Sequence, residues 1–158
     1  MDRLTKDEYG CLLALSASSR SEDYFTQVGG AAMTQDGRII GLSYNGLKSG
    51  MIKPAWMDQE ENRVEKGLHM LHAESNLGSL FRRDECHTVY LTISPCISCC
   101  SNLAALGIQR VVYINEYHRC NKFKEFFKFY NIEYKELNEQ EKINIVNTLS
   151  SLTKKLYV

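Results

Sequence analysis

The chain has 158 residues, enough for one domain whose core buries about 70% of the surface of the unfolded chain. Its 19 lysines and arginines balance 19 aspartates and glutamates, so we expect no broad cationic surface for long nucleic acid. The sequence has no apolar run approaching ~20 residues and no export signal near Met1. We therefore expect a single domain, residues 1–158, with no membrane segment, in the cytoplasm, which for a viral protein is the host's. There, six cysteines are expected to be thiols or metal ligands.

The predicted elements of the first half are a helix, a hairpin and a loop. An amphipathic helix is expected over residues 4–20. Two short strands follow, at 31–34 and 38–43, and Asp36-Gly37 between them is a strong hairpin signal. Residues 47–67 are polar and irregular, and long loops inside compact domains are often functional.

The second half alternates between helices and buried strands. A helix carrying His72 and Glu74 is expected to run to about residue 81, and another to extend from Pro95 to Gly107. Residues 88–93 and 110–114 are rich in β-branched and aromatic side chains, which favours strands. A helix at 122–130, a strand at 132–135 and a helix at 139–156 complete an α/β pattern with a sheet between helix layers. The last helix is expected to turn four residues inward: Ile143, Val146, Leu149 and Leu152.

Two short motifs carry the chemistry. His72-Ala73-Glu74 precedes Pro95-Cys96-Ile97-Ser98-Cys99, in which a helix start favours the anionic form of the thiols. Two thiolates and one imidazole leave the fourth position of a tetrahedral Zn²⁺ open to water, which is typical of a catalytic site. Zinc lowers the pKa of that water from about 15.7 to about 7. Glu74 is then expected to carry the proton to a substrate nitrogen rather than to bind the metal.

The combination of H-x-E with P-C-x-x-C is a known signature of zinc nucleobase deaminases. From the residues alone, the alternative is a redox Cys-x-x-Cys pair beside an unrelated helical His-Glu pair. A redox pair makes no demand for an upstream His-x-Glu, so the deaminase interpretation is favoured. Cys100 points about a quarter-turn away on the helix and is left out of the site.

Longer segments resemble the deoxycytidylate (dCMP) deaminases of the cytidine deaminase superfamily. The segments are RSEDYFTQVGG, RIIGLSYNGLKSG, LHAESN, TVYLTISPCISCCSNLAALGI and RVVYINEY, within residues 11–117. The zinc motif identifies only the superfamily. The SYNG turn and the segments that flank it narrow the resemblance to the dCMP deaminases within that superfamily. The resemblance implies a three-layer α/β/α fold with a five-stranded mixed sheet of order 2-1-3-4-5. It also implies zinc-dependent hydrolysis of dCMP to dUMP and ammonia, which supplies dUMP for thymidylate synthesis.

The resemblance assigns roles residue by residue. It makes His72, Cys96 and Cys99 the zinc ligands and Glu74 the proton shuttle. It implies that Asn45 forms a hydrogen bond with the sugar of the substrate, and that Ala73 and Tyr117 also bind the substrate. Read without the resemblance, Asn45-Gly46 is a common tight-turn dipeptide, and Tyr117 is a half-buried core tyrosine.

The phosphate partner is predicted from matching cations. Arg20 matches an arginine of the family's RS-x-D stretch, where a guanidinium can hold a phosphate with two hydrogen bonds. Lys48 and Arg119 are alternatives. Each of these cations, taken alone, also fits a solvated surface position.

The sequence departs from the family in two places. Lys48 stands where the family's Asn-Gly-x-Pro turn often has proline. Some members bind a second, structural zinc, but the further cysteines and histidines lack a clear ligand spacing here, so we predict one zinc per chain. They are Cys11, His69, Cys86, His87 and Cys120.

The resemblance also implies partners and regulation: a homo-oligomer, commonly a hexamer, activated by dCTP and inhibited by dTTP, with Mg²⁺ accompanying the triphosphate. Residues 47–67 offer four cations for such an effector, namely Lys48, Lys53, Arg63 and Lys66.

Two other function classes stay open. A polynucleotide-acting deaminase of the transfer-RNA adenosine type shares the zinc motif, but neutral charge argues against it. A non-catalytic zinc module has no use for Glu74.

Overall fold

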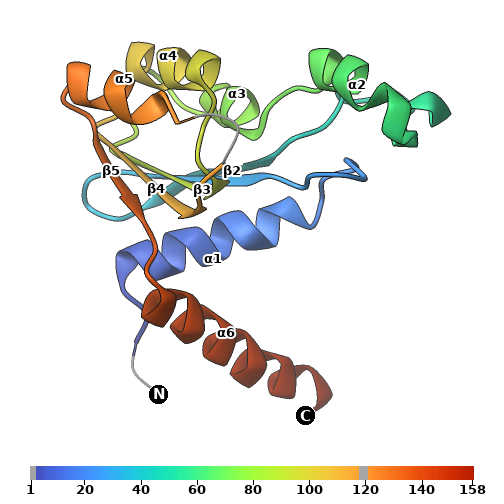
Figure 1. Ribbon diagram of the computed structural model, residues 1–158. Coiled ribbons are helices and arrows are strands. Elements are labelled where there is room, and N and C mark those ends of the chain that lie inside the picture. The colour runs from blue at the N-terminus through green and yellow to red at the C-terminus, as the bar shows by residue number, and fades with distance from the viewer. Residues whose placement is uncertain (1–2, 118–120) are drawn as a thin grey trace.

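The computed structural model describes residues 3–117 and 121–158. A five-stranded sheet of order β2-β1-β3-β4-β5 lies between two layers of helices (Figure 1). The strands are β1 (Gly29–Met33), β2 (Ile39–Tyr44), β3 (Thr88–Ile93), β4 (Arg110–Asn115) and β5 (Glu133–Glu136). β1 pairs antiparallel with β2 and β3, whereas β3, β4 and β5 run parallel. The predicted three-layer α/β/α fold and its strand order are confirmed.

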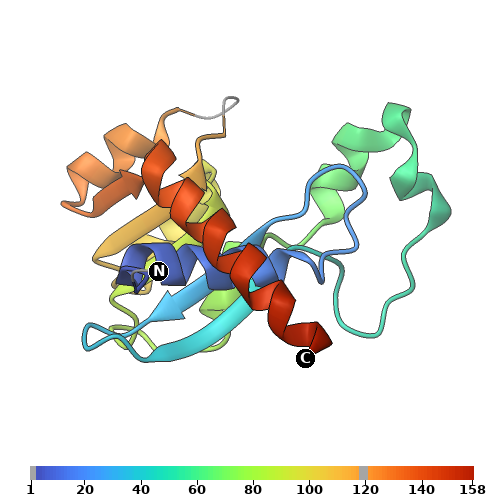
Figure 2. The same ribbon diagram turned by 90° about the horizontal axis from the view of Figure 1, so that it is seen from below.

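The helices divide between the two faces of the sheet. α3 (Ala73–Gly78), α4 (Ile97–Ala105) and α5 (Phe123–Phe129) cover one face, and α1 (Lys6–Ser18) covers the other (Figure 1). α6 (Glu139–Lys154) crosses α1 on its outer side (Figure 2). Each face has its own apolar cluster: Leu77, Leu103 and Phe123 are buried in one, and Ala14 and Ile145 in the other.

Local signals in the sequence explain where several elements begin and turn. Thr5 caps α1: its hydroxyl accepts from the Glu8 amide, and the Glu8 carboxylate accepts from the Thr5 amide, a capping box. Asn138 and Glu141 form the same arrangement at α6. In the β1–β2 hairpin, Gly37 has a φ of 94°, a conformation that glycine adopts without steric cost.

Two expectations about local structure were wrong. Residues 47–67 are not irregular throughout, because two 3₁₀ turns, Ala55–Asp58 and Glu60–Asn62, lead into α2 (Arg63–His69). The helix after His72 ends at Gly78 rather than near residue 81. In the first case helical turns form although polar residues and glycine weaken the periodic apolar signal, and in the second the helix ends at a glycine.

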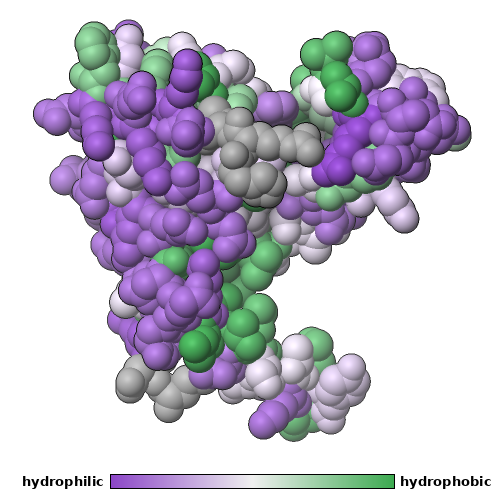
Figure 3. Space-filling model, viewed as in Figure 1, coloured by the Kyte–Doolittle hydropathy of each residue, from purple (hydrophilic) through white to green (hydrophobic). Residues whose placement is uncertain are grey.

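The predicted inward face of the last helix was also wrong. Ile145 is buried, while Val146 is 63% exposed. The other three residues of the predicted face are exposed as well: Ile143, Leu149 and Leu152. The side of α6 that meets α1 is partly polar, since the Asn144 amide donates to Glu8 at 2.6 Å. An apolar stripe on α6 therefore faces away from the sheet, and Figure 3 shows hydrophobic residues gathered on the surface beside α1 and α6.

Among the described residues, none of the helices combines the length and the apolar character needed to cross a membrane.

Candidate active site

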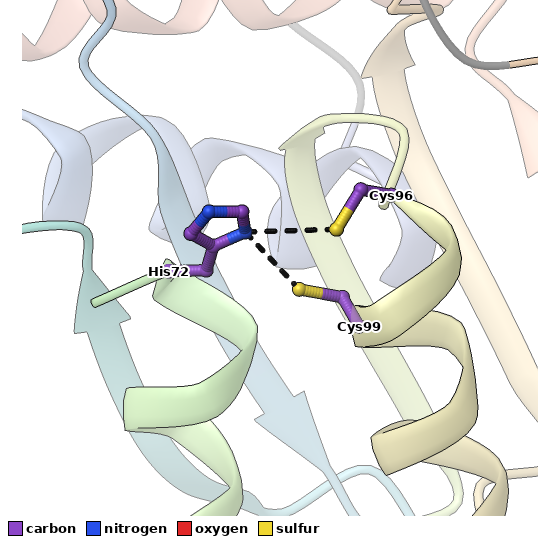
Figure 4. A group of neighbouring side chains, drawn as sticks. All are labelled: His72, Cys96 and Cys99. Carbon is purple, nitrogen blue, oxygen red and sulfur yellow. Dashed lines mark hydrogen bonds between the residues drawn. The ribbon is translucent and has the colours of Figure 1, made fainter. Parts of the chain in front are cut away.

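Two helix starts bring the predicted metal ligands together. His72 is the N-cap residue of α3, Cys96 is the N-cap residue of α4, and Cys99 lies in the first turn of α4. The His72 Nδ1 atom lies 3.7 Å from Cys96 Sγ and 3.3 Å from Cys99 Sγ (Figure 4). Tetrahedral zinc with ordinary bond lengths would separate nitrogen and sulfur ligands by roughly 3.6 Å. The three side chains therefore fit a zinc ion bound through Nδ1 of the imidazole.

The charges of these side chains also suit a metal. The Cys99 thiol and the His72 ring lower the pKa of the Cys96 thiol to about 3, whereas the neighbouring Cys96 and burial raise the pKa of the Cys99 thiol. The start of α4 favours a thiolate for the same reason that helix N-termini favour anions. Because zinc binds thiolates rather than thiols, a thiol that loses its proton readily is the appropriate ligand.

Glu74 lies beside the ligands in a buried position. It is in the first turn of α3, it is 6% exposed, and burial raises the pKa of its carboxyl group. Glu74 lines the same cleft as His72 and Cys96. A carboxyl group held there can accept a proton from a water molecule and return it to a bound base.

The cleft gathers most of the predicted site residues. Asn45, Ala73 and Tyr117 line it together with Glu74 and the ligands His72 and Cys96. The remaining lining residues were not predicted: Asp23, Thr26, Val28, Met70, Ile93 and Ser94. Ser94 helps to position Tyr117, because its hydroxyl accepts a hydrogen bond from the Tyr117 amide at 2.7 Å.

Asn45 is more constrained than the sequence indicated. Its carboxamide oxygen accepts from the Ser21 hydroxyl at 2.7 Å and from the Val28 amide at 2.8 Å. Its amide group donates to Asp23 Oδ2 at 3.3 Å and to the Thr26 carbonyl at 2.9 Å. Asn45 thus ties the segment before β1 to the end of β2, as well as lining the cleft.

The structure places Arg20 outside the lining of this cleft. Its guanidinium lies 6.0 Å from the centre of the Tyr44 ring, and it lines a neighbouring hollow together with Lys48. The alternative phosphate partner Arg119 lies outside the described residues.

Three of the four cations expected to meet an effector are held within the protein. Lys66 is buried against Asp23, and Lys53 donates to the Glu22 carbonyl and to Asp58. Arg63 pairs with Glu60 and lies over the Phe25 ring. Lys48 is exposed and lines the hollow that contains Arg20.

Within the described part of the chain, the cysteines and histidines considered for a second zinc do not join this cluster. Cys11 and Cys86 are buried within the two apolar clusters. His69 packs against Trp56, and His87 contacts the Thr88 hydroxyl. Cys120 lies outside the described residues.

Comparisons with known proteins agree with this site. The family described as the cytidine and deoxycytidylate deaminase zinc-binding region matches residues 4–115. The deoxycytidylate deaminase of Mycobacterium phage D29 is 31% identical over 128 residues, which cover 73% of this chain and 99% of that protein. The human deoxycytidylate deaminase is 27% identical over 125 residues, covering 74% of this chain and 69% of that protein.

A solved structure shares the fold. The dCMP deaminase of cyanophage S-TIM5, in its apo form, superposes with a TM-score of 0.68 and 21% identity. The superposition covers 83% of this chain and 96% of that chain. At this identity the likeness shows a common fold.

Proposed function

We propose that this chain, which belongs to the cytidine and deoxycytidylate deaminase family, hydrolyses dCMP to dUMP and ammonia. The observation that carries the proposal is the placement of Glu74 in one cleft with a His72–Cys96–Cys99 cluster. The relatives named as deoxycytidylate deaminases support the choice of substrate. The product would supply dUMP for thymidylate synthesis.

In this proposal His72, Cys96 and Cys99 hold one Zn²⁺. Zinc bound there would lower the pKa of a water molecule to about 7, so that a hydrolytic nucleophile is present at neutral pH. Glu74 would carry one proton of the attacking water to the ring nitrogen of the base. It would then carry the second proton, from the hydroxyl group added to the ring carbon, to the amino nitrogen that leaves as ammonia. The raised pKa of its buried carboxyl group suits a residue that must hold a proton between two transfers.

The remaining residues orient the nucleotide. Ala73, between the zinc ligand and the proton shuttle, and Tyr117, which follows β4, both line the cleft and would contact the base and the sugar. Asn45 would contact the sugar. Arg20 remains our candidate for the phosphate, and it would have to leave the Tyr44 ring to reach a nucleotide in the cleft.

One assay separates the substrate classes. Ammonia release should be measured with dCMP, with deoxycytidine, and with cytosine-containing and adenosine-containing oligonucleotides. We expect dCMP to be the preferred substrate because an anionic 5′-phosphate adds charge-assisted contacts. Equal rates with dCMP and deoxycytidine would contradict the nucleotide assignment. Activity confined to RNA would favour the polynucleotide-acting alternative.

We further propose activation by dCTP and inhibition by dTTP, each with Mg²⁺. Since Lys53, Arg63 and Lys66 are engaged within the protein, Lys48 is the cation of residues 47–67 best placed to meet a triphosphate. An effector can act only by binding the competent and incompetent states unequally. Saturation curves with dCMP that superimpose with and without each effector would contradict regulation.

A homo-oligomer is the final part of the proposal. The exposed apolar stripe on α6 supports it, because contiguous apolar surface of this kind commonly marks a protein interface. Light scattering should show a multiple of the 18.1 kDa chain mass. Val146→Glu, in the middle of the stripe, should shift the mass towards the monomer, and a monomeric wild-type protein would contradict the proposal.

A further inference from the structure

A buried ion pair joins α2 to the wall of the cleft. Lys66 is 6% exposed although it lies in a polar segment, and its Nζ atom is 2.6 Å from both carboxylate oxygens of Asp23. The two residues are 43 positions apart in the sequence. Removing two charges from water is costly, and replacing such a pair by apolar residues is often neutral for stability. The geometry therefore needs an explanation other than stability.

Asp23 is the centre of the network that fixes the wall. Its Oδ1 atom accepts from the Phe25 amide at 2.8 Å and from the Thr26 amide at 3.1 Å, which turns the chain. Its Oδ2 atom accepts from the Asn45 amide at 3.3 Å. Asp23, Thr26 and Asn45 all line the cleft. Lys66 thus binds a carboxylate that contacts two other lining residues of the cleft, Thr26 and Asn45.

The network also determines which way the Asn45 carboxamide faces. Its oxygen accepts from the Val28 amide, and its NH₂ group donates to Asp23. A flipped carboxamide would set two donors against each other at Val28 and two acceptors against each other at Asp23. The Val28 amide, the Thr26 carbonyl and the Asp23 carboxylate therefore all favour the same orientation of Asn45. Lys66 contributes by holding the Asp23 carboxylate in place.

The bond from Asn45 to Asp23 is the longest of the four that Asn45 makes. Both hydrogens of the Asn45 amide are donated within the protein, so a ligand hydroxyl can receive one only in exchange for a present partner. Of the two bonds that the Asn45 amide donates, the 3.3 Å bond to Asp23 is longer and weaker than the 2.9 Å bond to Thr26. It is therefore the bond that a ligand hydroxyl would replace. Asp23 would then keep its bonds to Lys66 and to the two backbone amides.

We propose that Lys66 is a positioning residue, which acts through Asp23 to present the Asn45 amide to the sugar of the substrate. The inference rests on the proposed function only in taking this cleft as the substrate site. Lys66 is not among the residues that line the cleft with the zinc ligands, and its Nζ atom binds Asp23, which does line it. Its loss should weaken substrate binding and leave the reacting groups in place.

The test compares Lys66→Met with Arg38→Met. Arg38 is a control because it is a cation in an exposed ion pair with Asp36, in the β1–β2 hairpin and outside the lining of the cleft. We expect Lys66→Met to raise the KM for dCMP roughly tenfold, the equivalent of one hydrogen bond, with kcat within about threefold and zinc content unchanged. Lys66→Arg should recover part of the loss, and Arg38→Met should behave as the wild type.

Two further measurements keep the test decisive. If Lys66→Met fails to fold, the double variant Asp23→Asn/Lys66→Met removes the unpaired charge and should fold with the same raised KM. Hydrogen exchange, followed by mass spectrometry, should become faster in residues 21–28 and 44–47 of either variant. An unchanged KM, a fall in kcat alone, or unchanged exchange would overturn the proposal. A wild-type protein without activity on dCMP would refute the proposed function, and hydrogen exchange would still test the positioning role.

Discussion

Replacing Glu74 by glutamine would test the proposed chemistry most directly. The substitution preserves the shape of a side chain that is 6% exposed, so it leaves no cavity. Because burial raises the pKa of the Glu74 carboxyl group, a neutral amide should not lower stability at neutral pH. General acid–base catalysis contributes about 10²- to 10⁴-fold, equivalent to roughly 3–5 kcal/mol of barrier. In the proposed mechanism Glu74 both accepts and delivers protons, so we expect a loss of kcat of about 10³-fold or more.

The assay is ammonia release at saturating dCMP, accompanied by metal analysis of the same sample. Glu74→Gln should retain one zinc per chain, because its carboxylate is not among the three clustered ligand atoms. His72→Ala is the control, since it removes a ligand and should lose zinc and activity together. Loss of zinc from Glu74→Gln would show that Glu74 is a ligand, and a kcat within tenfold of the wild type would exclude it as the proton carrier.

Three further predictions concern the metal, the fold and the pH. A strong chelator should abolish ammonia release, and Zn²⁺ but not Mg²⁺ should restore it, because thiolates prefer the softer ion. Gly29→Ala should lower stability by about 1–3 kcal/mol in thermal unfolding, since its Cβ would lie 1.9 Å from the Ala14 carbonyl oxygen, while Gly67→Ala, with nothing within 4 Å, should not. Burial alone would raise the pKa of Asp23, but Lys66 and two backbone amides outweigh it and hold the pKa below its usual value. This stabilisation is present above the unfolded pKa of about 3.9 and is lost as the pH falls through the folded value, so acid should destabilise the wild type more steeply than Asp23→Asn.

Much of the fold follows from signals between neighbouring residues. The turn at Asp36-Gly37 and the helix between Pro95 and Gly107 depend on backbone preferences that a short stretch reveals. Strand order depends on which strands meet across the sheet, and the residues alone did not determine it. The order came from the resemblance to a family, and the observed sheet confirms it.

The cluster of three metal-binding side chains could be predicted because its geometry is largely local. The spacing of Cys96 and Cys99 places both thiols at one helix start, and only the meeting of that helix with His72 depends on the fold. The Lys66–Asp23 pair could not be predicted in this way. A single lysine in a polar segment looks the same whether it is solvated or buried, and its partner lies far away in the sequence.

The last helix shows a different limit. The periodicity of α6 correctly predicts an apolar stripe, but it cannot tell which surface covers that stripe. Ile145, next to the stripe, meets the body of the protein, whereas Val146 faces outward. Amphipathic patterns are the same for a helix that packs on its own sheet and for one that packs on another chain.

The charges around the cleft explain how a neutral protein can accept an anionic nucleotide. Two carboxyl groups, those of Asp23 and Glu74, line the cleft and would repel a phosphate if both were ionised and unpaired. Lys66 compensates the charge of Asp23 at 2.6 Å. Because one of the two carboxyl groups is neutralised locally, one or two cations near the mouth of the cleft would be enough to hold the phosphate. A broad basic surface is therefore not required for the proposed reaction.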